Sequence, residues 1–197
     1  QPALKDIDMM DVIESEGVNR RDFMKWVSAT TATLMLPPMF APLVAEATEL
    51  MNRVPVIWIE LQDCAGNSEA LLRSSAPTVD DLLFDVLSLE YHETLQACAG
   101  HDADKQLEEA AHLFKGKYLL FVEGAIPMAM NGQYGTIGAS GETFHEHLVR
   151  MAKDSAAVVA VGTCATFGGV PAAAPNPTGA VGVMDIVKGK PIINIPA

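Results

Sequence analysis

Two cysteines, Cys64 and Cys164, have the surroundings expected of metal ligands or reactive thiols. Each follows an apolar run and lies among Gly, Ala and Thr residues. The chain has three cysteines, widely spaced, and this pattern is not a disulfide framework but favours metal binding or free thiols. The alternative for each cysteine is a buried small hydrophobic residue. We expect that role for Cys98, which lies in the helix-forming context Leu95-Gln96-Ala97.

Three polar residues accompany the two cysteines at the ends of apolar runs. Asp63 and Asn67 lie on either side of Cys64, and Glu123 ends the run 118–123. Glu123 could be a solvated loop carboxylate, or a proton-handling group or hydrogen-bond acceptor at a site. The five histidines have no convincing metal-binding spacing, so we expect surface or packing positions for them. The chain contains no Walker motif and no G-x-G-x-x-G, so nucleotide binding has no support.

Apolar runs that alternate with helical patterns must position these residues. We predict strands at Val54–Leu61, Leu87–Tyr91, Tyr118–Glu123, Ala156–Gly162 and Pro191–Ile195. Helices are expected from about Ser68, from Thr78 as N-cap through Val86, over Asp104–Phe114, over Thr143–Lys153 and within 179–187, with a long loop at 131–141. Strands that alternate with helices predict an α/β fold with a doubly wound parallel sheet of the flavodoxin-like type.

Such a sheet would gather the candidate residues at one edge. Parallel strands all end at the same edge, so the loops that carry Cys64, Glu123 and Cys164 would share it. Small residues around each sulfur would leave room for a group larger than a side chain. An iron–sulfur cluster needs thiolate ligands in such a space, with backbone N–H groups pointing at its sulfides. An iron–sulfur cluster is therefore one hypothesis for this edge.

The N-terminal part of the chain differs in composition from the rest. Residues 1–19 are acidic, and the pair Arg20-Arg21 then precedes an uncharged run over 26–45, a pattern that resembles a twin-arginine export signal. Three prolines interrupt this run and argue against a membrane-spanning helix. We expect an acidic segment with an export signal over 1–47 and a flavodoxin-like domain over 48–197. Export by this route would place the protein in the periplasm or on the outer face of the cytoplasmic membrane.

The totals limit the partners and suggest a longer protein. A net charge of −12 over 197 residues disfavours non-specific binding to nucleic acid or to an anionic membrane. The sequence begins with Gln1 and stops at Ala197, just after an apolar run. We therefore expect this chain to be a fragment that is truncated at its C-terminus.

Six segments of the chain resemble the N-terminal, flavodoxin-like domain of the small subunit of nickel–iron hydrogenases. They are IELQDCAGNSEALLRSSAPTVDDL, VLSLEYHETLQACAGH, FVEGAIP, VGTCATFGGV, NPTGAV and INIP, and they cover nearly all of the chain after Val54. The resemblance implies an electron-transfer subunit of an uptake-type hydrogenase, with the nickel–iron large subunit as its partner. It also implies a proximal 4Fe-4S cluster here, further iron–sulfur clusters in the missing C-terminal part, and no catalytic residue on this chain. The downstream electron acceptor is not indicated by the sequence.

The resemblance also implies a set of ligands. Four cysteines usually hold the proximal cluster in that family: two in a C-x-x-C, one in a G-[ST]-C-A loop and one just after I-P-G. Cys64 matches the first and Cys164 the third, Asn67 stands at the second, and the fourth would follow the end of this sequence. Glu123 matches a family glutamate close to the cluster. A carboxamide is a poorer iron ligand than a thiolate, and Asp63 offers a harder oxygen donor, so both Asp63 and Asn67 are candidates for the fourth ligand.

A second hypothesis belongs to a different functional class. The chain could be an interaction module that keeps the fold and binds the hydrogenase large subunit but has lost the cluster, and Asn67 is the main support for it. A flavin-binding domain is a weaker third option, because the loop after the first strand lacks the Ser/Thr-rich run that a phosphate would need.

Overall fold

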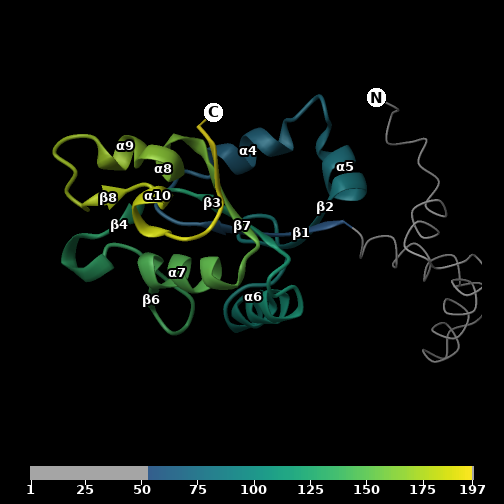
Figure 1. The fold of residues 1–197 in the computed structure, drawn as a ribbon, viewed down its shortest axis with the longest axis horizontal. Helices are drawn as coiled ribbons and strands as arrows, with labels where there is room; N and C mark the ends of the chain where they lie inside the picture. The colour runs from purple at the N-terminus through teal and green to yellow at the C-terminus, as the bar shows by residue number, and fades with distance from the viewer. Residues whose placement is uncertain (1–52, 197) are drawn as a thin grey trace, which may run out of the picture. The chain divides into compact units, whose positions relative to one another are not determined.

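The predicted parallel sheet is present in the computed structural model, which describes residues 53–196. Its strands are β1 (Val54–Glu60), β2 (Leu87–His92), β3 (Leu119–Glu123), β7 (Ala157–Val161) and β9 (Ile192–Ile195). Their order is β2-β1-β3-β7-β9, and every neighbouring pair is parallel. This is the strand order of flavodoxin-like sheets, so the predicted fold class is confirmed (Figure 1). The predicted export signal over 1–47 lies outside the described residues.

Helices cover both faces of the sheet. They are α4 (Gly66–Leu72), α5 (Val79–Asp81), α6 (His101–Leu113), α7 (Phe144–Asp154), α8 (Gly162–Phe167), α9 (Gly169–Ala172) and α10 (Val183–Ile186), with a π-helical turn at Leu82–Val86 and a 3-10 turn at Ala129–Gly132. Figure 1 shows α6 and α7 on one side of the sheet and α4 and α8 on the other. No helix within 53–196 is both long and apolar enough to cross a membrane.

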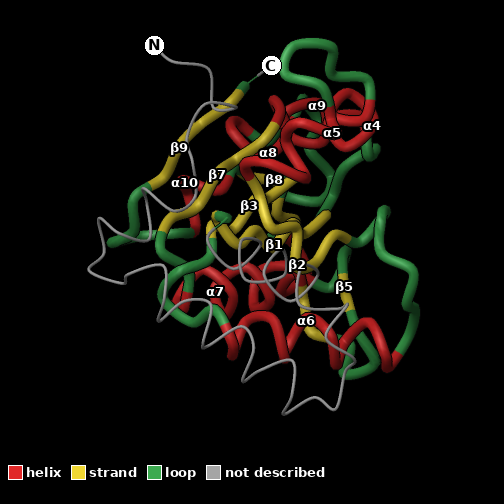
Figure 2. Tube along the Cα trace, turned by 90° about the vertical axis from the view of Figure 1, so that its right-hand side faces the viewer, coloured by secondary structure: helices red, strands yellow, loops and turns green. Residues whose placement is uncertain are grey.

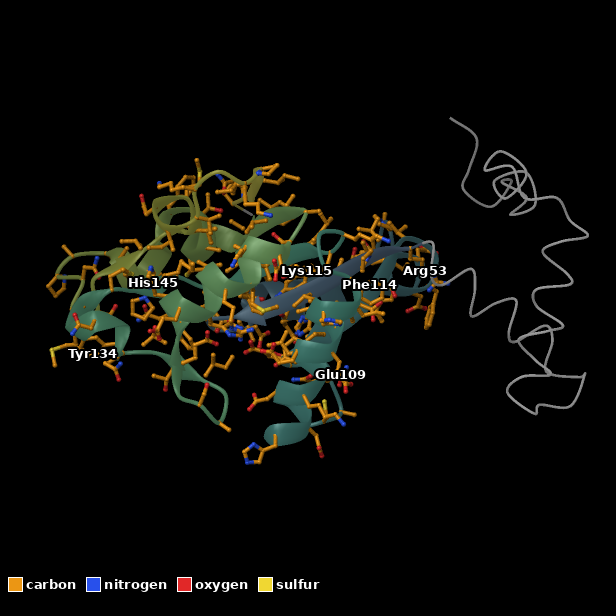
Figure 3. The ribbon with its side chains drawn as sticks, turned by 60° about the horizontal axis from the view of Figure 1, so that its bottom comes forward. Arg53, Glu109, Phe114, Lys115, Tyr134 and His145 are labelled. Atoms are coloured by element: carbon orange, nitrogen blue, oxygen red, sulfur yellow. The ribbon has the colours of Figure 1, made fainter. Side chains whose placement is uncertain are left out.

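The apolar faces predicted from the sequence form the core. The larger hydrophobic cluster joins strand residues such as Ile57 and Leu120 to Leu107 of α6 and to Leu148 and Met151 of α7. On the other face, Trp58 and Val159 pack with Leu71 of α4 in a smaller cluster. Charged residues of α6 lie on its outer side, as Figure 3 shows for Glu109. Side chains of β1, β3 and β7 therefore pack on both faces of the sheet.

Two threonines begin helices as predicted. Thr78 and Thr143 each accept a hydrogen bond from a backbone N–H three residues later, and the carboxylates of Asp81 and Glu146 accept bonds in return. These capping boxes satisfy donors that the first helical turn leaves unpaired. They explain why α5 and α7 start where they do.

Several predicted boundaries were wrong. Helix α6 starts at His101 rather than Asp104, and the segment 131–141 is not a simple loop because β5 (Thr136–Ile137) pairs with β6 (Glu142–Thr143) in a short hairpin. A further antiparallel pair joins β4 (Ile126–Pro127) to β8 (Ala180–Val181). The segment expected as a loop after the fourth strand is helix α8, because Gly162 with φ +82° lets the chain turn directly from strand to helix.

The prediction for Cys98 was also wrong. This cysteine lies in irregular structure before α6 and is half-buried, and its thiol donates a hydrogen bond to Gln106 Oε1 at 2.7 Å. The helix-forming residues before it do not form a helix, since β2 ends at His92 and a turn follows.

Candidate cofactor site

Three central strands end at the same level of the sheet. Glu60 at the end of β1 pairs with Glu123 at the end of β3, and Glu123 pairs with Val161 at the end of β7. These strand ends and the segments that follow them form the site edge. Figure 2 shows β1, β3 and β7 side by side. The chain reaches Cys64 from β1 and Cys164 from β7, so the two cysteines leave the sheet at one edge on either side of β3, as predicted.

Both cysteines are free thiols with a glycine beside the sulfur. Cys64 is exposed and Cys164, on α8, is half-buried. A Cβ added at Gly66 would lie 3.1 Å from Cys64 Sγ, and one at Gly169 would lie 2.6 Å from Cys164 Sγ. Glycine at these two positions therefore keeps each sulfur free of a crowding side chain, which agrees with the small residues that the sequence analysis singled out.

Asn67 bridges the segments after β1 and β7. A Cβ added at Gly162 would lie 2.3 Å from Asn67 Nδ2 and 2.7 Å from its Oδ1. The carboxamide is thus packed on the backbone of Gly162, two residues before Cys164. This contact joins the first turn of α4 to the start of α8.

Glu123, the last residue of β3, binds the first turn of α4 at the same edge. Its side chain is fully buried and accepts four hydrogen bonds: from Asn67 N at 2.8 Å, Asn67 Nδ2 at 3.0 Å, Ser68 N at 3.0 Å and Ser68 Oγ at 2.7 Å. A carboxylate placed there satisfies backbone donors that the first turn of α4 leaves unpaired. The structure therefore places Glu123 and Asn67 in direct contact.

Several polar side chains that the sequence analysis did not identify are linked to Glu123 by hydrogen bonds. Ser68 Oγ also lies 2.9 Å from Glu60 Oε1 and 3.2 Å from His92 Nε2. Thr94 Oγ1 donates to Glu60, and Thr94 N donates to His92 Nδ1. Burial lowers the pKa of His92, although the charges of Glu60 and Glu123 oppose this shift. The His92 imidazole stacks on Trp58 with ring centroids 4.9 Å apart.

Asp63 belongs to a group of carboxylates. Oxygen atoms of Glu60, Asp63 and Glu123 all lie within 4.8 Å of one another. Burial raises the pKa of Asp63, as do the negative charges of Glu123 and Glu60, while the N–H that Ala65 donates at 2.8 Å opposes the shift. The Asp63 carboxylate therefore lies beside two other carboxylates and accepts a hydrogen bond from its own loop.

Glu93 is a further acid near this group that the sequence analysis did not single out. Burial raises the pKa of Glu93 to about 8, the charges of Glu60 and Asp63 add to the shift, and a backbone hydrogen bond at Glu60 opposes it. Its Oε1 is buried without a hydrogen-bond partner among the described residues. Glu93 is thus neutral over most of the physiological pH range.

We expect Glu93→Gln to stabilise the protein at pH 8 by on the order of 2 kcal/mol, with no gain at pH 4. Folding raises the pKa, so between the unfolded value and about 8 the folded state binds a proton that the unfolded state has released. The wild type therefore loses stability as pH rises through this window. Urea unfolding of both proteins from pH 4 to 8 measures the effect. If the free energies of unfolding of the wild type and Glu93→Gln changed in parallel with pH, the prediction would be wrong.

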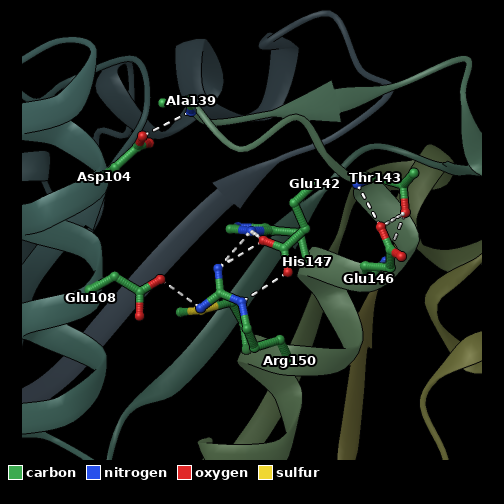
Figure 4. Close-up of polar contacts among 9 residues, drawn as sticks. Asp104, Glu108, Ala139, Glu142, Thr143, Glu146, His147 and Arg150 are labelled. Carbon is green, nitrogen blue, oxygen red and sulfur yellow. Dashed lines mark hydrogen bonds and ion pairs between the residues drawn. The ribbon is translucent and has the colours of Figure 1, made fainter.

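A second polar cluster lies away from the site edge and holds the β5–β6 hairpin (Figure 4). Arg150 of α7 donates to both carboxylate oxygens of Glu142 at 2.9 Å and to Glu108 of α6 at 2.7 Å. His147, buried as a packing residue, has Nδ1 3.0 Å from Glu142 Oε2. A cavity of about 310 Å³ lies beside these residues. The contacts join the hairpin to two helices, and none involves a candidate ligand.

The donors at the site edge fit part of an iron–sulfur site. Two free thiols with space beside them are suitable ligands for such a cluster. The other two candidates are engaged within the protein, Asn67 with Glu123 and Asp63 with Ala65. Within the described residues the site therefore offers two thiolates, and further ligands would have to come from elsewhere.

Comparison with known proteins shows which family the chain belongs to. The model of the family described as "NADH ubiquinone oxidoreductase, 20 Kd subunit" matches residues 64–197. The quinone-reactive Ni/Fe-hydrogenase small chain of Wolinella succinogenes is 49% identical over 185 residues, which are 94% of this chain and 52% of that protein. The Hydrogenase-2 small chain of Escherichia coli is 44% identical, with 94% of this chain and 49% of that protein covered.

Solved structures give the same result. The reduced, active form of the Ni-Fe-Se hydrogenase from Desulfomicrobium baculatum superposes with a TM-score of 0.70 at 40% identity, covering 74% of this chain and 56% of that one. The chain spans about half the length of the curated relatives that it matches. It belongs to the NADH ubiquinone oxidoreductase 20 Kd subunit family, and its resemblance to the small subunits of nickel–iron hydrogenases is confirmed.

Proposed function

We propose that this chain is part of the electron-transfer subunit of a nickel–iron uptake hydrogenase. Its partner would be the large subunit that carries the nickel–iron site, and electrons would leave that site through a proximal 4Fe-4S cluster at the site edge. One observation carries the proposal: in-register ends of β1, β3 and β7 bring Cys64 and Cys164 to one edge, each sulfur beside a glycine. The relatives named as hydrogenase small chains support it.

The residues of this chain would hold the cluster and keep its surroundings rigid. A bound 4Fe-4S cluster supplies reversible one-electron transfer. Cys64 and Cys164 would provide thiolate ligands. Glu123, with its four hydrogen bonds, fixes the start of α4 and thus the loop that carries Cys64. A ligand loop that does not move between redox states keeps the reorganisation energy of electron transfer small. This suits an electron-transfer subunit rather than a catalytic one.

The export signal remains a proposal as well. Folded export with the large subunit would place the complex in the periplasm or on the outer face of the cytoplasmic membrane. Fractionation of cells that express the full-length protein, with Arg20→Lys and Arg21→Lys changed together, tests this. We expect the variant to stay in the cytoplasm. Unchanged export would contradict the twin-arginine assignment.

One observation favours a second candidate, a cluster-free module that binds the large subunit. Asn67 stands at a position where the resembling family has a cysteine, and it joins Glu123 and Gly162 through protein contacts alone. Contacts within the protein therefore join the segments of the site edge. This is what a scaffold that had lost its cluster would need.

Iron and acid-labile sulfide analysis of the co-expressed, anaerobically purified full-length subunits separates the two candidates. Electron transfer through this chain requires iron and sulfide that are lost when Cys64 and Cys164 are both replaced by serine. If the double variant keeps the wild-type iron content and still binds the large subunit, the site edge holds no cluster and the scaffold is correct.

A further inference from the structure

The cavity of about 310 Å³ beside the β5–β6 hairpin lies between three parts of the chain. Its walls come from the hairpin turn at 138–140, from α6 with Asp104 and Leu107, and from α7 with His147 and Arg150. We propose that this cavity binds a small organic ammonium ion, that is, a primary amine in its protonated form. The cavity involves none of the candidate ligands of the site edge, so this inference goes beyond the proposed function and does not depend on it.

Polar contacts link the hairpin and the two helices around the cavity (Figure 4). The Ala139 N–H of the hairpin turn donates to Asp104 of α6 at 2.9 Å. Arg150 of α7 donates to Glu142 of the hairpin and to Glu108 of α6. Each wall of the cavity is therefore joined to another by a hydrogen bond to a charged group.

His147 supplies an acceptor that has no donor. Its side chain lines the cavity and is 1% exposed, and its Nδ1 lies 3.0 Å from Glu142 Oε2. An ionised carboxylate only accepts hydrogen bonds, so Nδ1 carries the proton in this contact. Arg150 Nη2 lies 3.3 Å from the same nitrogen but donates to Glu142 at 2.9 Å.

The other nitrogen of this ring is the one that a ligand would satisfy. In a neutral imidazole with the proton on Nδ1, Nε2 is an acceptor. His147 Nε2 is buried and has no hydrogen-bond partner within 53–196. Because Nδ1 faces Glu142, Nε2 lies on the opposite side of the ring. A buried acceptor without a donor costs free energy, and an N–H group of a bound ligand would remove that cost.

The charges around the cavity select a cation. Three carboxylates, those of Asp104, Glu108 and Glu142, line it together with the guanidinium of Arg150. The contacts described above use Oδ2 of Asp104 and Oε1 of Glu108, and the second oxygen of each carboxylate can accept from a ligand. An anion would meet an excess of negative charge here, whereas a primary ammonium group brings one positive charge and three N–H donors.

The apolar part of the wall favours an organic ion over a bare metal ion. Leu107 and Tyr91 are buried and line the cavity beside the acids, so they can contact hydrocarbon. Among the residues that the structure describes, the His, Cys, Asp and Glu side chains close enough to share a metal ion are Glu60, Asp63 and Glu123 of the site edge. The cavity therefore fits a short alkyl chain with an ammonium head.

The test uses the full-length protein, co-purified with its large subunit, in isothermal titration calorimetry at pH 8 and low ionic strength. The probe is n-butylammonium chloride, which is charged at this pH, whereas an imidazole is neutral. We expect one butylammonium ion per small subunit with a Kd on the order of 1 mM. Tetramethylammonium has the same charge but no N–H and should bind at least about tenfold more weakly. Butyrate should not bind.

Variants locate the binding to the cavity. His147→Phe keeps a ring but removes the acceptor, and should weaken butylammonium binding about tenfold. Glu108→Gln removes one charge from the cavity and should weaken it about threefold. Glu109→Gln is the matched control, because Glu109 is the next residue of α6, is exposed and pairs with Lys105 outside the cavity. It should bind butylammonium as the wild type does.

Three results would overturn the inference. They are a wild type that gives no heat with butylammonium, so that the cavity holds water only, equal affinities for butylammonium and tetramethylammonium, and equal affinities of Glu108→Gln and Glu109→Gln. If His147→Phe does not fold, the comparison of the two glutamine variants decides alone. None of these results bears on the iron and sulfide content that tests the proposed function.

Discussion

Glu123→Gln should lower the free energy of unfolding by about 3 kcal/mol, although the change replaces one oxygen by an NH₂ group. Glu123 is fully buried and accepts four hydrogen bonds from Asn67 and Ser68. A glutamine presents one carbonyl oxygen and two further donors, so at least one pair of donors would face an NH₂ group instead of an acceptor. Unpaired buried donors cost about 1–3 kcal/mol each. Urea unfolding of both proteins measures the loss.

Glu69→Gln is the matched control for this change. Glu69 belongs to the segment Gly66–Leu72 that forms α4, is exposed, and forms an ion pair with Arg73 one turn later. Exposed pairs of this kind contribute little, so the control should change stability by less than about 0.5 kcal/mol. If the two variants lost the same stability, the hydrogen bonds at Glu123 would not be what holds the site edge together.

Gly162→Ala should cost about 4 kcal/mol, the larger part from overpacking. Gly162 has φ +82°, a conformation that an alanine adopts only with strain. Its new methyl group would also meet the Asn67 carboxamide at 2.3 Å, and the hydrogen bonds to Glu123 prevent the carboxamide from moving away. The change should also release the start of α4, which shows as faster hydrogen exchange at Asn67 and Ser68.

Gly116→Ala separates the two contributions. Gly116 has φ +77°, nearly the same backbone conformation, but an added Cβ there meets nothing within 4 Å. This control should therefore lose only the backbone term, about 1 kcal/mol. The double variant Gly162→Ala with Asn67→Ala should recover part of the loss, because the clash is removed. Equal losses in Gly162→Ala and Gly116→Ala would show that Asn67 does not press on Gly162.

These two predictions concern the same structural arrangement. Glu123 at the end of β3 binds the start of α4, and Asn67 of α4 in turn packs on Gly162 at the start of α8. The loops of Cys64 and Cys164 are therefore held in place by hydrogen bonds and packing within the protein.

Much of this could be predicted from the sequence because the signals are local. Apolar runs of strand length, threonine caps before α5 and α7, and glycines after strands identify a parallel α/β sheet, and the parallel sheet by itself requires Cys64, Glu123 and Cys164 to share an edge. The segments that the chain shares with hydrogenase small subunits also indicated the family, which the comparisons confirm.

What the sequence could not determine depends on contacts between segments far apart in the chain. Nothing local to Asn67 indicates that its amide binds Glu123 at the end of β3, or that Gly162 at the start of α8 leaves space for it. The buried group of Glu60, Ser68 and His92 and the raised pKa of Glu93 likewise arise from burial and from neighbouring charges. Residue types and spacing select the sheet and its edge, whereas the packing of three strand ends decides which polar atoms remain free to bind a ligand, because hydrogen bonds and desolvation act through space rather than along the chain.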